Sequence, residues 1–307
     1  MKNKVSIIIP IYNRVHLISE TLKSIRDQTY TNWECIIVDD HSTDGTFELL
    51  SELARKDSKI RVYLKPDHLP KGPSASRNYG LSLAEGEFIN WFDSDDLMHP
   101  QKLAKDLVAL EDETIDFTIS QSEFFGKNKP KKKYWNQKLF SNQPIDDFIL
   151  KKIGWSTNAP LWRKKSLSNK KLQFCESLIT ADDYLFHIEA LNNNLTPSVI
   201  NETLVYQREH DNRLNEYKGK SKFKCYVYAY IFDNVKVIRT ETINTIENKM
   251  LQQIKALYRN RNFKLARRYS NFLSKKTEKH SLVLTLFGLK LKTLIYQFTG
   301  KGYSFFK

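Results

Sequence analysis

The chain has 307 residues and a mass of 36.1 kDa, and 40% of its residues are hydrophobic, which is enough for one large domain with an appendage. Its formal net charge is +14, and its three cysteines, Cys35, Cys175 and Cys225, form no Cys-x-x-Cys pair. This cysteine usage argues against a structural zinc site and suits a reducing compartment.

Three short apolar runs near the N-terminus predict buried strands with helices between them. The runs cover residues 5–10, 33–38 and 60–64. Apolar residues at helical spacing predict one helix over residues 15–28 and another after the turn at residues 41–46. This alternation predicts an α/β fold in which a mainly parallel sheet is flanked by helices.

The densest group of carboxylates follows a further apolar run, residues 88–92. Asp93, Asp95 and Asp96 lie within four residues. Like charges at this distance raise each other's pKa unless a cation lies between them. Oxygen ligands suit Mg²⁺ or Mn²⁺, which bind one or two protein carboxylates and leave other positions to water and phosphates. The stretch predicts a metal–diphosphate site, and an acidic loop that caps the next helix, residues 100–110, is the alternative.

The predicted strands place several polar side chains at one edge of the sheet. Tyr12, Asp40 and the 93–96 stretch all follow the carboxyl end of a predicted strand. Ligands of open α/β sheets bind outside these ends. We therefore expect these residues to share one site.

Two more segments carry charged residues at predicted helix starts. Arg77 lies among small residues in the segment 72–80, where a helix N-terminus and a bidentate arginine suit a phosphate. A surface arginine that bridges acidic neighbours is the alternative. Asp182 and Asp183 follow Thr180, which is the predicted N-cap, and acidic residues in a first turn are ordinarily capping or dipole residues.

Taken in order, these pieces resemble a family 2 glycosyltransferase with the A-type, Rossmann-like fold that binds nucleotide sugars. The resemblance covers roughly the first two-thirds of the chain. No single piece is specific, but their order is. The matching segments are residues 5–14, 38–46, 72–80, 86–89, 93–96, 182–183 and His210, which follows a strand predicted at residues 203–206.

The resemblance implies a pocket for a uracil base at the ends of the first two strands. Pro10 and Tyr12 would line it, with Tyr12 stacking on the base. Asp40 would accept a hydrogen bond from the imide N–H, because a carboxylate only accepts. The alternatives are a tyrosine at the edge of the core and a helix-capping aspartate, although Asp39 could fill the capping role.

The resemblance also implies a divalent cation, Mn²⁺ or Mg²⁺, at the diphosphate. Asp95 would hold the cation, Asp93 would face the sugar or ribose, and Arg77 would lie near the nucleotide. His210 would approach the metal or the diphosphate, and imidazole suits Mn²⁺ better than Mg²⁺.

The catalytic base implied by the resemblance is Asp183. The family has glutamate before this aspartate, and the chain has Asp182 there, so Asp182 could substitute. The implied reaction is inverting transfer of a sugar from a nucleotide donor, expected to be a UDP-sugar, to the hydroxyl of a glycan or lipid-linked acceptor. Such a reaction belongs to cell-surface polysaccharide or glycolipid synthesis.

Two other functions remain open at this stage. A nucleotidyltransferase that forms sugar nucleotides would need a glycine-rich loop after the first strand, and residues 12–16 contain no glycine. A catalytically degenerate binding module is the other alternative, and retention of Asp40, Asp93, Asp95 and Asp183 argues against it. A dehydrogenase lacks its Gly-x-Gly-x-x-Gly motif.

The charge divides the chain into a predicted catalytic domain, residues 1–214, and a basic, mainly helical region, residues 215–307. The first carries 29 Lys and Arg against 30 Asp and Glu, a net of −1, and the second 20 against 5, a net of +15. We expect the basic region to bind an anionic membrane surface, or to pack on the core or another subunit. No motif supports nucleic-acid binding. Since no apolar stretch has the length of a membrane span or a signal peptide, we expect a cytoplasmic enzyme, at the inner face of the membrane.

Overall fold

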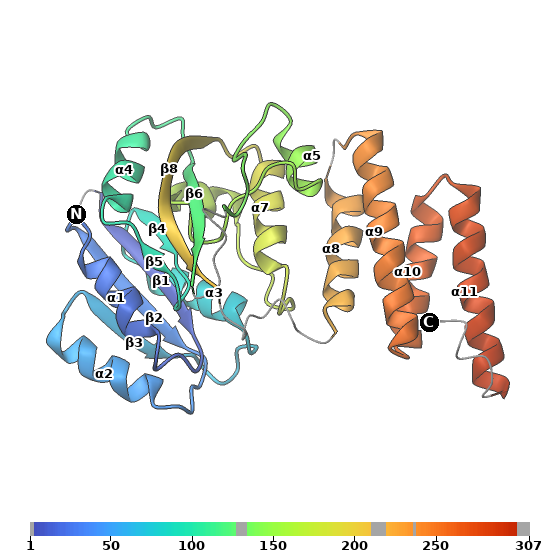
Figure 1. The fold of residues 1–307 in the computed structure, drawn as a ribbon, viewed down its shortest axis with the longest axis horizontal. Coiled ribbons are helices and arrows are strands. Elements are labelled where there is room, and N and C mark those ends of the chain that lie inside the picture. The colour runs from blue at the N-terminus through green and yellow to red at the C-terminus, as the bar shows by residue number, and fades with distance from the viewer. Residues whose placement is uncertain (1–2, 127–133, 210–218, 236–237, 300–307) are drawn as a thin grey trace. The chain divides into compact units, whose positions relative to one another are not determined.

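The computed structural model describes residues 3–126, 134–209, 219–235 and 238–299 (Figure 1). The chain divides into two compact units, Met1–Arg213 and Leu214–Lys307. The described part of the first unit contains a sheet flanked by helices, and that of the second contains helices alone. The predicted α/β class with a helical C-terminal region is therefore confirmed.

The strands of the first unit form one mixed sheet in the order β3-β2-β1-β4-β7-β6-β8-β5. The neighbours β3, β2, β1 and β4 run parallel, as do β6 and β8. β7 is antiparallel to β4 and β6, and β5 is antiparallel to β8. The strands are β1 (Val5–Ile11), β2 (Trp33–Asp39), β3 (Ile60–Leu64), β4 (Phe88–Trp91), β5 (Leu97–Met98), β6 (Phe117–Phe125), β7 (Trp162–Arg163) and β8 (Pro197–Arg208).

The two strands in the middle of the parallel half are buried throughout. Every residue of β1 and β2 is buried, which explains why both read as unbroken apolar runs. Pro10 of β1 pairs with Val38 of β2, and Ile11 pairs with Asp39. Because β2, β1 and β4 are parallel neighbours, the loops that follow them leave the sheet at the same edge.

The helix α3 lies unusually close to the sheet. A Cβ atom at Gly80 would stand 2.4 Å from Cγ2 of Ile8 on β1, so only glycine fits there. This approach fixes α3 over β1 and carries its first turns to the edge where the loops leave the sheet. The helices of the first unit are α1 (Ile18–Arg26), α2 (Thr46–Lys56), α3 (Pro73–Leu83), α4 (Lys102–Ala109), α5 (Pro144–Ile149), α6 (Lys164–Lys170) and α7 (Asp182–Asn192).

The first helix is shorter than its predicted range, residues 15–28. The chain after β1 first makes a turn, in which the Arg14 backbone N–H donates to Thr46 Oγ1 and the Leu17 N–H donates to the Arg14 carbonyl. These bonds hold the loop against the start of α2, so α1 begins only at Ile18.

The second unit contains four described helices with a core of its own. Four apolar residues at helical spacing are all buried: Ile246, Met250, Ile254 and Leu257. α11 packs against α10 and α9. The helices are α8 (Lys220–Asn234), α9 (Thr240–Arg259), α10 (Phe263–Lys276) and α11 (His280–Thr299).

Membrane crossing requires a long helix with an apolar stretch and few charges. No helix in the described part of the chain meets that requirement.

Candidate active site

The carboxyl ends of β1 and β2 bring Tyr12 and Asp40 to the same edge of the sheet. Tyr12 follows β1 directly and its side chain is 54% exposed, so it is no core residue. Asp40 follows β2, and its backbone N–H donates to the Ile11 carbonyl at 2.8 Å. Pro10 lies buried inside β1. These positions do not test whether a uracil base binds here, so the uracil pocket stays a prediction.

The Asp40 carboxylate is held from two sides. One oxygen accepts the backbone N–H of Gly72 at 2.7 Å, and the other forms an ion pair with the buried ammonium group of Lys65. Lys65 also donates to the Pro70 carbonyl at 2.7 Å. Gly72 has φ of +120°, a conformation that favours glycine. Asp39, rather than Asp40, bonds within the following turn, accepting the Ser42 N–H at 2.7 Å.

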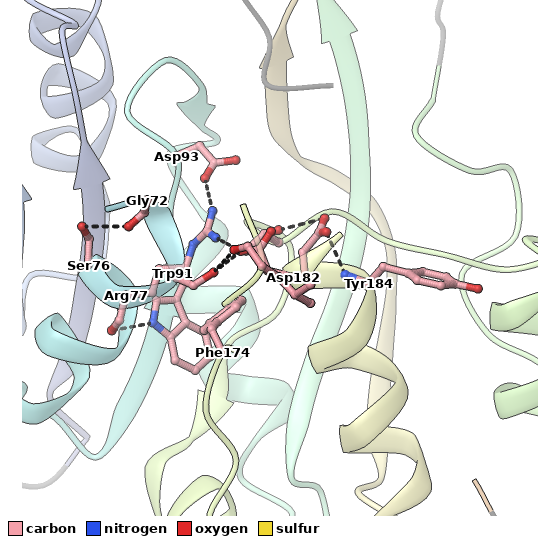
Figure 2. Close-up of polar contacts among 12 residues, drawn as sticks. Gly72, Ser76, Arg77, Trp91, Asp93, Phe174, Asp182 and Tyr184 are labelled. Atoms are coloured by element: carbon pink, nitrogen blue, oxygen red, sulfur yellow. Dashed lines mark hydrogen bonds and ion pairs between the residues drawn. The ribbon is translucent and has the colours of Figure 1, made fainter. Parts of the chain in front are cut away.

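Arg77 is the centre of the charged network at this edge (Figure 2). Its side chain comes from α3, is 6% exposed and lies over the ring of Phe174. One terminal nitrogen donates to Asp93 at 2.9 Å and the other to Asp182 at 2.9 Å. Both terminal nitrogens therefore bond carboxylates in this structure, and the predicted contact between Arg77 and a phosphate stays a prediction.

Asp182 begins α7, and its carboxylate bonds side chains of α3. Its Oδ2 accepts the Ser74 hydroxyl at 2.9 Å as well as Arg77, and both partners lie on α3. The predicted N-cap Thr180 was wrong. The cap position is Ala181, which has φ of 64°, and the buried Thr180 hydroxyl makes no hydrogen bond in the described structure. The start of α7 is thus fixed by α3 and not by a local cap.

Asp183 is the less buried member of the pair. Its Oδ1 accepts the Tyr184 N–H at 2.7 Å, and its Oδ2 lies 3.5 Å from the Thr157 hydroxyl. Burial raises the pKa of the Asp183 carboxyl, and the positive charge of Arg77 opposes that rise. Burial likewise raises the pKa of Asp182. Asp183 therefore combines access with a raised pKa, which are properties of a general base.

The three carboxylates after β4 have different surroundings. Asp96 is buried and accepts bonds from the Asn158 amide at 2.5 Å and the Arg208 N–H at 2.9 Å, which suits a structural role. Burial raises the pKa of Asp96, and the charges of Asp93 and Asp95 raise it further. The Asp95 carboxylate lies 3.6 Å from the Arg14 guanidinium.

The carboxylates after β4 repel one another. Burial raises the pKa of Asp93, and its neighbour Asp95 adds to the rise against the charge of Arg77. A cation would relieve this repulsion, so the donor set fits a hard divalent ion. Among the described residues, no group of three or more His, Cys, Asp or Glu side chains is arranged to hold a metal. His210 lies outside the described residues.

Asn158 is a site residue that sequence reasoning missed. Its Oδ1 accepts the Asp93 N–H at 3.0 Å, while its amide nitrogen bonds Asp96, so it fixes the whole acidic loop. Trp155, in the same segment, is buried, with its ring centroid 4.7 Å from that of Phe148.

Known proteins were compared with the chain. The model for glycosyl transferase family 2 matches residues 6–167, which is more than half of the chain. An uncharacterized glycosyltransferase of Rickettsia felis is 41% identical over 115 residues, which are 38% of this chain and 18% of that protein. The poly(ribitol-phosphate) beta-N-acetylglucosaminyltransferase TarS of Staphylococcus aureus is 29% identical over 277 residues, covering 86% of this chain and 45% of TarS.

The fold matches solved structures as well. Residues 1–349 of S. aureus TarS, crystallised with UDP-GlcNAc, superpose with a TM-score of 0.70 at 21% identity, covering 98% of this chain and 93% of that one. This likeness confirms the A-type fold. The chain spans less than half the length of several curated relatives that it matches. Because the family model matches more than half of its residues, the chain belongs to glycosyl transferase family 2.

Proposed function

We propose that the chain is an inverting glycosyltransferase that moves a sugar from a UDP-sugar to an acceptor hydroxyl. One observation carries this proposal. The Arg77 guanidinium bonds both Asp93, which follows β4, and Asp182, which opens α7. The Arg77 side chain therefore links Asp93, which is expected to face the donor, to Asp182, the neighbour of the candidate base Asp183.

Asp183 is the proposed general base. The acceptor oxygen would form its bond to the anomeric carbon while the bond from that carbon to the diphosphate oxygen breaks on the opposite face. The proton of the acceptor hydroxyl would pass to Asp183. A raised pKa favours this step, because a carboxylate of ordinary pKa is a weak base.

Asp182 has a different proposed role, although it lies next to the base. Arg77 and Ser74 occupy one of its oxygens, so it anchors the start of α7. We therefore propose Asp183, the less buried residue of the two, as the proton acceptor.

Metal dependence is also a proposal. Asp95 would hold a divalent cation, Mn²⁺ or Mg²⁺, together with His210, and Asp93 would face the sugar or ribose. When bound, such a cation supplies positive charge that stabilises the departing nucleoside diphosphate. The mutual repulsion of the carboxylates after β4 supports this assignment.

The donor is proposed from the base pocket and from the relatives. Tyr12 is exposed at the end of β1 and can stack on a base, and Asp40 is held in place beside it by Lys65 and Gly72. TarS was crystallised with UDP-GlcNAc, so UDP-GlcNAc is the first donor to try.

The acceptor is proposed to be a glycan or lipid-linked glycan of a cell-surface polymer. TarS is a poly(ribitol-phosphate) glycosyltransferase, which supports this class. We further propose a cytoplasmic enzyme that works at the inner face of the membrane, where its basic region meets anionic lipid.

A screen of nucleotide sugars for release of the nucleoside diphosphate tests this function without knowledge of the acceptor. We expect slow UDP release from one UDP-sugar in the presence of Mn²⁺. Asp183→Asn is the matched control, because it should bind UDP yet lose the release. Formation of a sugar nucleotide from a sugar phosphate would instead indicate a nucleotidyltransferase. Failure to bind any nucleotide would instead favour the alternative of a catalytically degenerate binding module.

A further inference from the structure

Helix α11 has apolar side chains on two opposite sides. On one side Leu282 and Leu286 are buried in the core of the second unit. On the other side five large apolar side chains are exposed, with Leu284 at 70% and Phe287 at 62%. We call this exposed set the outer row; it consists of Leu284, Phe287, Leu291, Leu294 and Ile295.

The outer row is a continuous stripe along the helix. At about 100° per residue, its five members fall within an arc of roughly 100°, opposite the buried side. Lys290 and Lys292 lie one on each flank of this arc. An apolar stripe with a lysine on either side is the pattern of a helix that lies flat in the interface of a bilayer.

The stripe differs from the exposed apolar side chains of the first unit. There, large apolar residues such as Leu64 and Val108 are exposed on separate elements, which is ordinary for a protein surface. Five on one helix face form a contiguous patch, and such patches mark interaction sites.

Charge selects the occupant of this patch. Residues 215–307 carry a net charge of +15. A second copy of the chain would bring an equal positive charge to the contact and be repelled. A bilayer rich in anionic lipid offers apolar depth for the row and negative charge for the surrounding lysines and arginines.

We propose that the outer row of α11 inserts into the headgroup region of an anionic membrane and holds the helix parallel to its plane. This deepens the membrane-surface part of the proposed function by naming the face that makes contact. Leu282 and Leu286 belong to the core of the second unit and cannot reach lipid while that unit stays folded.

The test is sedimentation of the full chain with vesicles of phosphatidylglycerol and phosphatidylcholine, compared with phosphatidylcholine alone. We expect binding to the anionic vesicles at low salt, and loss of most of it at about 1 M salt, where charges are screened within about 3 Å. The variant Leu284→Ser/Phe287→Ser/Leu291→Ser should bind at least tenfold more weakly. The matched control Leu64→Ser/Val108→Ser removes apolar surface of similar exposure from the first unit and should bind as the parent does.

A second measurement follows insertion directly. Phe287→Trp should show a blue shift of fluorescence on addition of anionic vesicles, which Val108→Trp should not show. Three results would overturn the proposal: the parent chain stays in the supernatant at low salt, the triple variant binds undiminished, or the row proves to be the contact of a dimer that the triple variant dissociates. None of these readouts needs transfer activity, so the proposal and the proposed function can fail separately.

Discussion

The two units of the chain bury different kinds of side chain. At one edge of its sheet, the first unit buries charged groups, among them Lys65, Arg77 and Asp182, each with an opposite charge beside it. The core of the second unit is mainly apolar, and its many basic residues lie mostly outside it. The positive charge of this protein is therefore not a property of its candidate active site.

This difference has an energetic meaning. Buried charges are costly unless they are paired, and well-packed apolar residues would stabilise a fold at least as well. The first unit nevertheless buries Arg77 between Asp93 and Asp182. This arrangement fixes the positions of the three side chains at a cost in stability. In the second unit the buried Glu247 pairs with the more exposed Lys279, and the core is otherwise mainly apolar, which suits a part that supports or anchors.

The largest effect is expected at the donor side of the first unit. Asp95→Asn should abolish Mn²⁺-dependent binding of UDP, because an amide cannot supply the charge of a carboxylate. Calorimetry with UDP and Mn²⁺ measures this directly, with Asp116→Asn, outside the acidic loop, as a control. Unchanged affinity would remove Asp95 from the metal site.

Substitutions in the core of the second unit should act through stability, in contrast to those at the exposed outer row. Leu286→Ala removes a fully buried side chain and should lower the free energy of unfolding by about 2–5 kcal/mol. Leu284→Ala lies two residues earlier, on the exposed side of the helix, and should change the free energy of unfolding by less than about 0.5 kcal/mol. Urea unfolding followed by circular dichroism compares the two. Equal effects would mean that α11 does not pack as described.

Arg77→Lys should slow turnover about tenfold while changing the affinity for UDP little. Lysine keeps the charge, but one ammonium group cannot bond Asp93 and Asp182 as the guanidinium fork does. If Arg77 acts through Asp182, adding Asp182→Asn should cost little more than either change alone. A loss of UDP affinity that matches the loss of turnover would make Arg77 a phosphate ligand instead.

The smallest expected effect is a shift in the pH profile. The base works only when ionised, so activity falls as the pH is lowered through its pKa. Because the pKa of Asp183 is raised, this fall should lie above the ordinary aspartate value of about 3.9. Thr157→Val removes a hydrogen bond that favours the ionised form and should move the fall to higher pH. A profile that does not move would separate Thr157 from the base.

The parallel half of the fold was predictable because its two middle strands, β1 and β2, are buried on both faces. Predicted residues 5–10, 33–38 and 60–64 differ from β1, β2 and β3 by no more than one residue. The other half, which mixes parallel and antiparallel neighbours, was predicted less completely, because β7 has only two residues and is defined by its partners β4 and β6. No local pattern in the sequence announces such a strand.

The site divides in the same way. Motif order placed Tyr12, Asp40 and Asp93 at strand ends, and the structure brings those ends to one edge of the sheet. The order of the motifs could not show that Arg77 bonds Asp182, which lies 105 residues away, or that Asn158 holds the acidic loop together. These contacts depend on how α3, α7 and the loop before β7 meet in space.

The central claim is that Asp183 takes the proton while Asp182 holds the helix that carries it. UDP release from the preferred donor, measured for Asp183→Asn and Asp182→Asn beside the parent chain, tests it most directly. The account predicts a loss of roughly a hundredfold or more for Asp183→Asn with UDP affinity preserved, and a smaller loss for Asp182→Asn. An inactive Asp182→Asn beside an active Asp183→Asn would contradict it.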